Sequence, residues 1–140
     1  MQRIVIAMFA FSWSIYSAVG GGQPIKDAPS FIRVDSGKEI KVLSITRTTL
    51  HGSDEPAVSV QYVSDITLSD TDRLYSEVEQ VFNAIRAFGE RQQVHAIVVT
   101  ANEPASGLLS MSHGAGWCWK QHADGSWAPP DESDHARVPK

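Results

Sequence analysis

The sequence predicts an α+β fold: a small single domain in which one long amphipathic helix packs on one face of a mixed, mostly antiparallel sheet. Three observations predict it, namely two β-rich segments joined by a polar loop, one apolar stripe at helical spacing, and a short apolar run after that stripe. Their order is β-β-α-β-β, with a further short strand near the end. A chain of 140 residues has room for one hydrophobic core of ordinary size.

The first two strands are predicted to form a β-hairpin. Residues 39–50 (EIKVLSITRTTL) are rich in β-branched side chains, and residues 58–64 (VSVQYVS) alternate apolar and polar side chains for most of their length. Residues 51–56 (HGSDEP) lie between them and are typical of a loop that is longer than a tight two-residue turn.

The helix is predicted to begin at Ser69. A serine N-cap with Asp72 three residues later can satisfy the first backbone amides and oppose the positive end of the helix dipole. Apolar residues then recur at helical spacing and form one stripe: Leu74, Val78, Val81, Phe82, Ile85 and Phe88. Charged and amide residues lie largely off that stripe: Glu77, Glu79, Gln80, Asn83, Arg86 and Glu90. Gly89 is expected to terminate the helix.

A buried central strand is predicted over residues 94–101 (VHAIVVTA), a nearly continuous apolar run rich in β-branched residues. A strand, a helix and another strand in succession indicate a right-handed crossover onto a parallel neighbour. Residues 108–112 and 116–122 are predicted as further strands, and Asp124 with Gly125 marks a hairpin turn into Trp127.

Residues 1–20 are predicted to be a secretory signal peptide. Arg3 gives a positive start, residues 4–11 (IVIAMFAF) are an unbroken apolar run, and small residues follow, so cleavage is expected after Gly20 or Gly22. The alternative is a retained membrane anchor, but the 16 residues from 4 to 19 fall short of the roughly 20 that a bilayer span needs. The protein is therefore expected to be periplasmic or secreted, with no stable membrane anchor after cleavage.

The mature chain is expected to divide into a flexible lead-in over residues 21–30, one α+β domain over residues 31–127 and a disordered tail over residues 128–140. The absence of any Asn-x-Ser/Thr triplet favours a bacterial exported protein over a eukaryotic one. A single cysteine excludes a disulfide framework within one chain.

The charge indicates the kind of partner to expect. The formal net charge is −4, and removal of Arg3 with the signal peptide leaves 11 basic and 16 acidic residues, a charge of −5. An acidic chain excludes a broad basic face, so nucleic acid and anionic membranes are poor candidates, and it favours a protein partner, basic in character. The oligomeric state is not predicted.

The most unusual composition lies in residues 113–122 (HGAGWCWKQH). Cys118 could be a nucleophile with a histidine base, but a small apolar cysteine in the core is favoured. His113, Cys118 and His122 are ligand types that suit zinc. Cys118 and His122, however, lie four residues apart, about 13 Å along a strand at ~3.3 Å per residue, which is too far for one ion. No metal or cofactor is expected.

An aromatic binding platform is the third hypothesis for this segment. Trp117 and Trp119 share one face of a strand, where they could bind a partner or pack in the core beneath the helix, and the core is favoured. The face of the sheet on which Trp127 lies depends on the length of the turn. A two-residue turn pairs Trp127 with His122 and places it on the face opposite Trp117 and Trp119. A three-residue loop pairs it with Gln121 and places all three indoles on one face. Both turns stay open, so the partner-binding candidates are Trp117, Trp119, His122 and Trp127.

No motif in the sequence identifies a reaction, because no carboxylate pair and no phosphate-binding glycine loop is evident. The chain is therefore expected to be an exported small binding protein without catalytic activity, such as an inhibitor or immunity-type partner of another exported protein. The alternatives are a carbohydrate- or ligand-binding module that uses the Trp-rich C-terminal hairpin, and a small enzyme that depends on Cys118.

Overall fold

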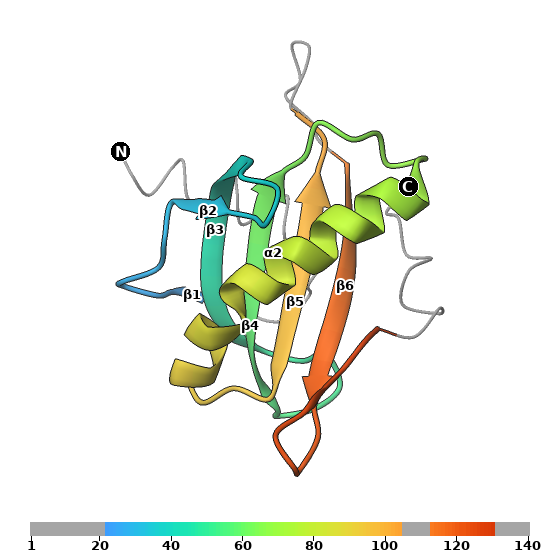
Figure 1. Cartoon of the computed structure of the whole chain (residues 1–140). Helices are drawn as coiled ribbons and strands as arrows, with labels where there is room; N and C mark the ends of the chain where they lie inside the picture. The colour runs from blue at the N-terminus through green and yellow to red at the C-terminus, as the bar shows by residue number, and fades with distance from the viewer. Residues whose placement is uncertain (1–21, 105–112, 131–140) are drawn as a thin grey trace.

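The computed structural model describes residues 22–104 and 113–130, in which one long helix lies across a single sheet (Figure 1). In chain order the elements are β1 (Gln23–Pro24), β2 (Phe31–Arg33), β3 (Glu39–Thr49), β4 (Pro56–Val63), α2 (Thr71–Arg91), β5 (Ala96–Asn102), β6 (Gly114–Gln121) and β7 (Trp127–Ala128). The predicted α+β fold with a mixed, mostly antiparallel sheet is confirmed. Within the described ranges, no helix combines the length and apolar character that a membrane span requires.

The sheet runs in the order β1-β3-β4-β5-β6-β7, and β2 pairs with β3 at the side of this path. The predicted hairpin is β3–β4, with a register shift between Val42 and Ser44. β4 and β5 are the one parallel pair among the described strands, and α2 crosses over between them as the order of elements predicted. The other paired strands are antiparallel.

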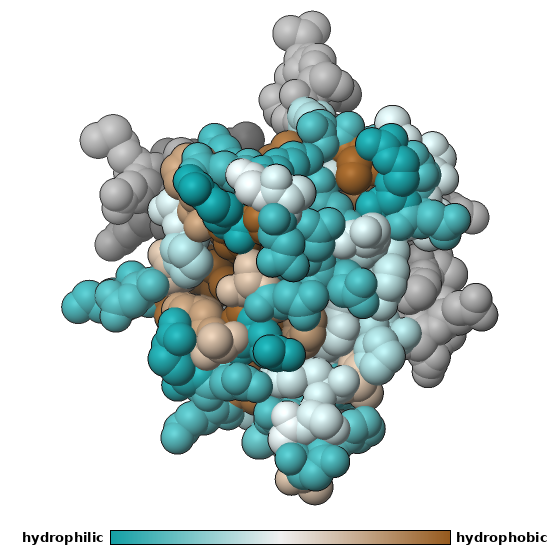
Figure 2. Space-filling model, viewed as in Figure 1, coloured by the Kyte–Doolittle hydropathy of each residue, from teal (hydrophilic) through white to brown (hydrophobic). Residues whose placement is uncertain are grey.

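The hydrophobic core lies between α2 and the face of the sheet that it covers. Side chains alternate along a strand, so the register places three rows of residues against the helix. These rows are Val58, Ile97 and Trp119; Val60, Val99 and Trp117; and Tyr62, Ala101 and Ala115. Trp117 and Trp119 are therefore core residues, the alternative that the sequence favoured. On the surface of the molecule that carries α2, Figure 2 shows hydrophobic residues only in limited areas between hydrophilic ones.

Both predicted ends of the helix need correction. α2 begins at Thr71 with Asp70, not Ser69, as its N-cap, and no side chain makes the capping hydrogen bond. The Asp70 carboxylate instead accepts a hydrogen bond from Arg73 at 3.2 Å. At the other end the helix continues past Gly89 to Arg91, with Gln92 as C-cap.

Gly89 serves close packing rather than termination. A Cβ atom at this position would lie 2.6 Å from Cδ1 of Ile97, a fully buried residue of β5. The missing side chain thus lets the last turns of α2 approach the sheet. The left-handed residue that follows the helix is Gln93, with φ 60°, and its amide donates to the Glu90 carbonyl at 3.0 Å.

The segment expected to be a flexible lead-in carries β1. Gln23 lies opposite Arg47, Pro24 lies opposite Thr46, and the Ile25 amide donates to the Ile45 carbonyl at 3.3 Å. The predicted signal peptide over residues 1–20, the predicted strand over residues 108–112 and most of the predicted tail lie outside the described residues. The described part of the expected tail, residues 128–130, begins with the last residue of β7.

Candidate functional site

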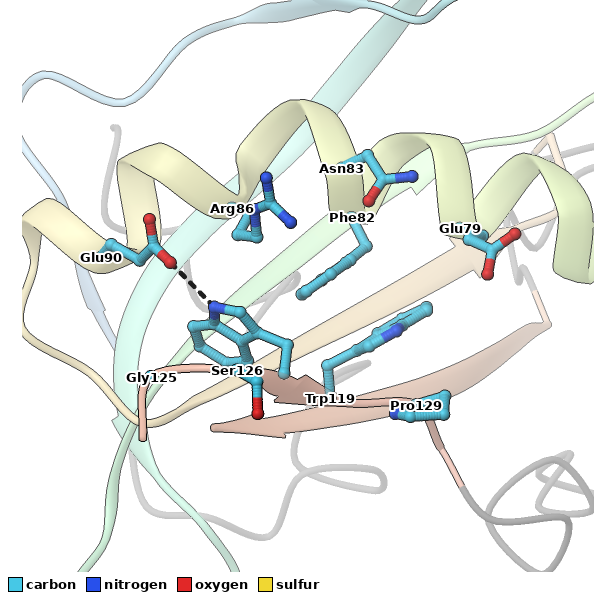
Figure 3. Close-up of a pocket in the computed structure, with 10 residues that line it drawn as sticks. Glu79, Phe82, Asn83, Arg86, Glu90, Trp119, Gly125, Ser126 and Pro129 are labelled. Atoms are coloured by element: carbon cyan, nitrogen blue, oxygen red, sulfur yellow. Dashed lines mark hydrogen bonds between the residues drawn. The ribbon is translucent and has the colours of Figure 1, made fainter. Parts of the chain in front are cut away.

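An open groove of about 570 Å³ lies between α2 and the C-terminal hairpin of β6 and β7 (Figure 3). Its lining comes from the helix (Glu79, Phe82, Asn83, Arg86 and Glu90), from β6 (Trp119) and from the turn, β7 and the chain that follows (Gly125, Ser126, Trp127 and Pro129). Two of the four predicted partner-binding residues, Trp119 and Trp127, therefore meet at one site.

Three aromatic rings line this groove. Phe82 and Trp119 stack with centroids 4.4 Å apart and planes 8° apart, and Phe82 and Trp127 meet in a T-shaped arrangement with centroids 5.6 Å apart and planes 71° apart. Phe82 and Trp119 are buried, whereas Trp127 is half-buried. Trp127 is therefore the ring that offers a surface to a ligand, and the other two hold the floor beneath it.

The turn before β7 decides where Trp127 points. Trp127 lies opposite Gln121, so residues 123–125 form a three-residue loop, and the His122 amide donates to the Ser126 carbonyl at 2.7 Å. Gly125 adopts a φ of +91°, a backbone conformation that residues with a side chain rarely adopt. The three-residue alternative is thus the correct one, and it places Trp127 on the face that carries Trp117 and Trp119.

A hydrogen bond fixes the orientation of the Trp127 ring. Its indole Nε1–H donates to Oε2 of Glu90 at 2.9 Å (Figure 3). Because an indole has a single N–H donor, this contact selects one orientation of the ring beside α2. Glu90 thus acts as a positioning residue for the accessible aromatic surface.

The polar rim of the groove follows one side of α2. Residues 79, 83, 86 and 90 are spaced as neighbours along one helix stripe, and all four side chains are exposed. They supply two carboxylates, one amide and one guanidinium. The sequence analysis placed them only largely off the apolar stripe; their spacing, taken together with a Trp-rich hairpin, is the signal that could have identified them.

The other two candidate residues lie elsewhere. Trp117 is buried beneath α2, where its ring is 6.1 Å from that of Tyr75, and it does not line the groove. His122 is exposed in the hairpin turn, where its backbone closes the loop, and its side chain is not part of the groove lining.

Cys118 lies on the sheet face opposite α2, because it alternates with Trp117 and Trp119 and pairs with Val98. It is half-buried, not the core residue that the sequence favoured. His113 and His122 flank β6 at opposite ends, about 30 Å apart at ~3.3 Å per residue. Residues 22–104 and 113–130 contain no group of three or more histidine, cysteine or acidic side chains that could hold a metal ion.

A partly buried ionic cluster centred on Glu77, beneath the first half of α2, was missed by sequence reasoning. Glu77, predicted to lie off the apolar stripe, is only 6% exposed. Its carboxylate accepts hydrogen bonds from Tyr62 Oη at 3.0 Å, from Ser64 Oγ at 2.6 Å and from Lys38 Nζ at 2.7 Å. Lys38 also donates to Asp65 at 2.8 Å. The cluster therefore ties the β2–β3 turn and the end of β4 to the helix.

The protonation states of this cluster follow from burial and charge. Burial, and then the charge of Glu77, raise the pKa of the Tyr62 hydroxyl far above its ordinary value, so Tyr62 remains a donor. Hydrogen bonds to Asp65 and Glu77 raise the pKa of Lys38, and the bond from Lys38 lowers the pKa of Asp65 below 3.8. Each group is thus engaged with another member, which favours a structural role.

Asp65 is expected to make the stability of the folded protein depend on pH in the acid range. A carboxylate whose pKa is lower in the folded state contributes stability above its ordinary pKa of 3.8, and that contribution is lost as the pH falls through the folded value. At pH 7, Asp65→Asn should therefore melt below the wild type, and the gap should close as the pH falls below the ordinary value of 3.8. Thermal unfolding followed by circular dichroism measures this, with Asp54→Asn in the β3–β4 loop as control. A gap that stays constant down to pH 2 would contradict the assignment.

The fold and the groove together define a small α+β protein with an open aromatic site at the junction of its helix and its C-terminal hairpin. Comparison of the chain with protein-family models, with curated proteins and with solved structures finds no match.

Proposed function

We propose that this chain is an exported binding protein without catalytic activity, and that its partner sits in the groove between α2 and the β6–β7 hairpin. The observation that carries the proposal is an accessible tryptophan, Trp127, held in one orientation by Glu90 over a floor of stacked aromatic rings. The volume of about 570 Å³ lies within the range of about 300–1,000 Å³ that is usual for ligand sites.

Two properties of the groove support binding. Tryptophan is enriched among residues that dominate binding energy, and a ring fixed before the partner arrives loses little conformational entropy on binding. The exposed side chains around it supply hydrogen bonds that orient a partner.

The spacing of the carboxylates supports a role other than acid–base catalysis. Glu79 and Glu90 are eleven residues apart on α2, about 16 Å along the axis at 1.5 Å per residue. Paired catalytic carboxylates of glycoside hydrolases, for comparison, stand roughly 5–10 Å apart. Glu90 is also engaged by the Trp127 indole.

The charge of the chain supports a protein partner. The charge of −5 expected after loss of residues 1–20 would attract a basic exported protein, as an inhibitor or immunity-type partner does, and such a complex should weaken in salt. A saccharide is the second candidate partner, favoured by the combination of aromatic floor and polar rim in the groove.

Loss of Trp127 is expected to release the partner. The tagged chain, produced in its own organism, would be used to capture partners from the exported fraction at low salt. Trp127→Ala should retain at most a tenth of the partner, since truncation of an interface hot spot costs about 2 kcal/mol or more. The matched control is Phe31→Ala, because Phe31 is the most exposed large hydrophobic residue described, at 55%, and is not part of the groove lining.

Quantitative mass spectrometry of the eluted proteins and glycans measures the result. Equal retention by the wild type and by Trp127→Ala would overturn the assignment of the groove, provided that both proteins melt cooperatively. A partner lost from Phe31→Ala instead would move the binding surface to the β2 side of the sheet.

A further inference from the structure

We propose that the groove binds one ring of a neutral saccharide, an inference that rests on the proposed binding function and takes its second candidate partner, rather than a basic protein, as the occupant of the groove. It follows from three properties of the groove: a flat aromatic surface, a rim that both donates and accepts hydrogen bonds, and charges of both signs on the same helix stripe.

The aromatic floor suits the apolar face of a sugar. A pyranose ring presents C–H bonds on its faces and hydroxyl groups around its edge, so it can lie flat against an indole. Trp127 supplies this surface, because it is half-buried and its plane is fixed by Glu90. Phe82 and Trp119 stack on one another beside it, and Phe82 contacts the Trp127 ring in a T-shaped arrangement.

The rim suits hydroxyl groups because a hydroxyl both donates and accepts hydrogen bonds. Arg86 supplies donors only, Glu79 supplies acceptors only, and the Asn83 amide supplies both. Glu90 uses Oε2 for the Trp127 indole, and its Oε1 is a further acceptor on the same carboxylate. Figure 3 shows these side chains along α2, beside the aromatic rings. A ring of hydroxyls can therefore find partners of both kinds.

The mixed charge of the rim favours a ligand without charge. A cationic ligand would approach Arg86, and an anionic ligand would approach Glu79 and Glu90. A charge removed from water without a partner is costly, whereas a neutral polyol needs only hydrogen bonds. A basic side chain of a partner protein is the competing occupant, and the test below separates it from a sugar.

The test titrates the full exported chain, labelled with ¹⁵N, with disaccharides while the indole N–H signal of Trp127 is followed by NMR. The neutral probes are maltose, cellobiose and N,N′-diacetylchitobiose; the charged probes are the glucosamine dimer and digalacturonate. We expect a saturable shift with at least one neutral probe below 50 mM, and an affinity at least fivefold weaker for both charged dimers.

Variants attribute the binding to the groove. Arg86→Gln should strengthen binding of the cationic dimer at least threefold, because the repelling guanidinium is gone. Arg73→Gln, an exposed arginine of the same helix outside the groove, should not change it. Trp127→Phe should retain part of the affinity for the neutral probe through its remaining ring, whereas Trp127→Ala should lose at least tenfold, measured by intrinsic fluorescence of the other tryptophans.

Two results would overturn the proposal that the groove binds a saccharide. One is the absence of saturation with every neutral probe while Trp127→Ala still loses its captured partner; the proposed function then stands and the occupant is a protein side chain. The other is binding of a charged dimer as tight as that of the neutral ones. Retention of the partner by Trp127→Ala would instead refute the proposed function itself.

Discussion

Glu77→Ala is expected to lower the free energy of unfolding by about 3 kcal/mol. The substitution removes the acceptor of three hydrogen bonds at a position that is 6% exposed. It leaves the Tyr62 hydroxyl buried without this acceptor, and it removes one of the two carboxylates that hold Lys38. Lys38 is partly exposed and keeps Asp65, so the loss should stay below that of a fully buried ion pair. Urea unfolding followed by circular dichroism measures the change.

The matched control is Glu79→Ala, two residues away on the same helix but exposed, which should change the stability by less than about 0.5 kcal/mol. Tyr62→Phe, which removes one donor and leaves the rest of the cluster in place, should cost about 1 kcal/mol. A loss below 1 kcal/mol for Glu77→Ala would show that the carboxylate gains no net stability from its three donors.

The central elements of the fold could be predicted because each has a clear local pattern, whereas the short strands β1 and β2 were not predicted. The hairpin β3–β4, the apolar stripe of α2 and the parallel strand β5 follow from alternation, helical spacing and a short apolar run. The order of these elements then leaves one simple connection, a crossover by the helix. Local pattern thus determines topology here, because the chain has a single long helix among its described elements.

The predictions made from the sequence were wrong where the role of a residue depends on a partner that is distant in the chain. Glu77 is polar, yet it is buried because Lys38, Tyr62 and Ser64 come to it from other parts of the chain. Gly89 has the residue type of a terminator, yet its neighbour across the core, Ile97, gives the reason for a glycine. Neither partner is visible in the helical pattern itself.

The candidate site could be predicted only in part. The Trp-rich hairpin was recognisable, but the position of Trp127 depended on a turn that two loop lengths could close. The structure closes it with Gly125 at φ +91° and with Asp124, whose Oδ1 accepts hydrogen bonds from the amide and hydroxyl of Ser126 at 2.9 and 2.6 Å. The partnership of this hairpin with the polar stripe of α2 is tertiary, and no local pattern encodes it.

Trp119→Ala is expected to destabilise the protein by about 3–5 kcal/mol, the largest effect of any substitution considered. The side chain is 3% exposed, stacks on Phe82 with centroids 4.4 Å apart, and lies 6.2 Å from Tyr75 with planes 12° apart. Its removal leaves a cavity between β6 and α2 that the surrounding residues can fill only in part. Urea unfolding with circular dichroism detection measures the loss.

Trp127→Ala is the contrasting variant, and it should cost only about 1 kcal/mol. Its ring is half-buried at the end of the sheet, and its indole hydrogen bond goes to an exposed carboxylate. If both variants lost the same stability, Trp127 would be a core residue and its loss of binding could not be attributed to the groove. A difference of 2 kcal/mol or more separates the two roles: Trp119 then builds the floor as part of the core, and Trp127 is the residue at which binding can be removed while the fold is retained.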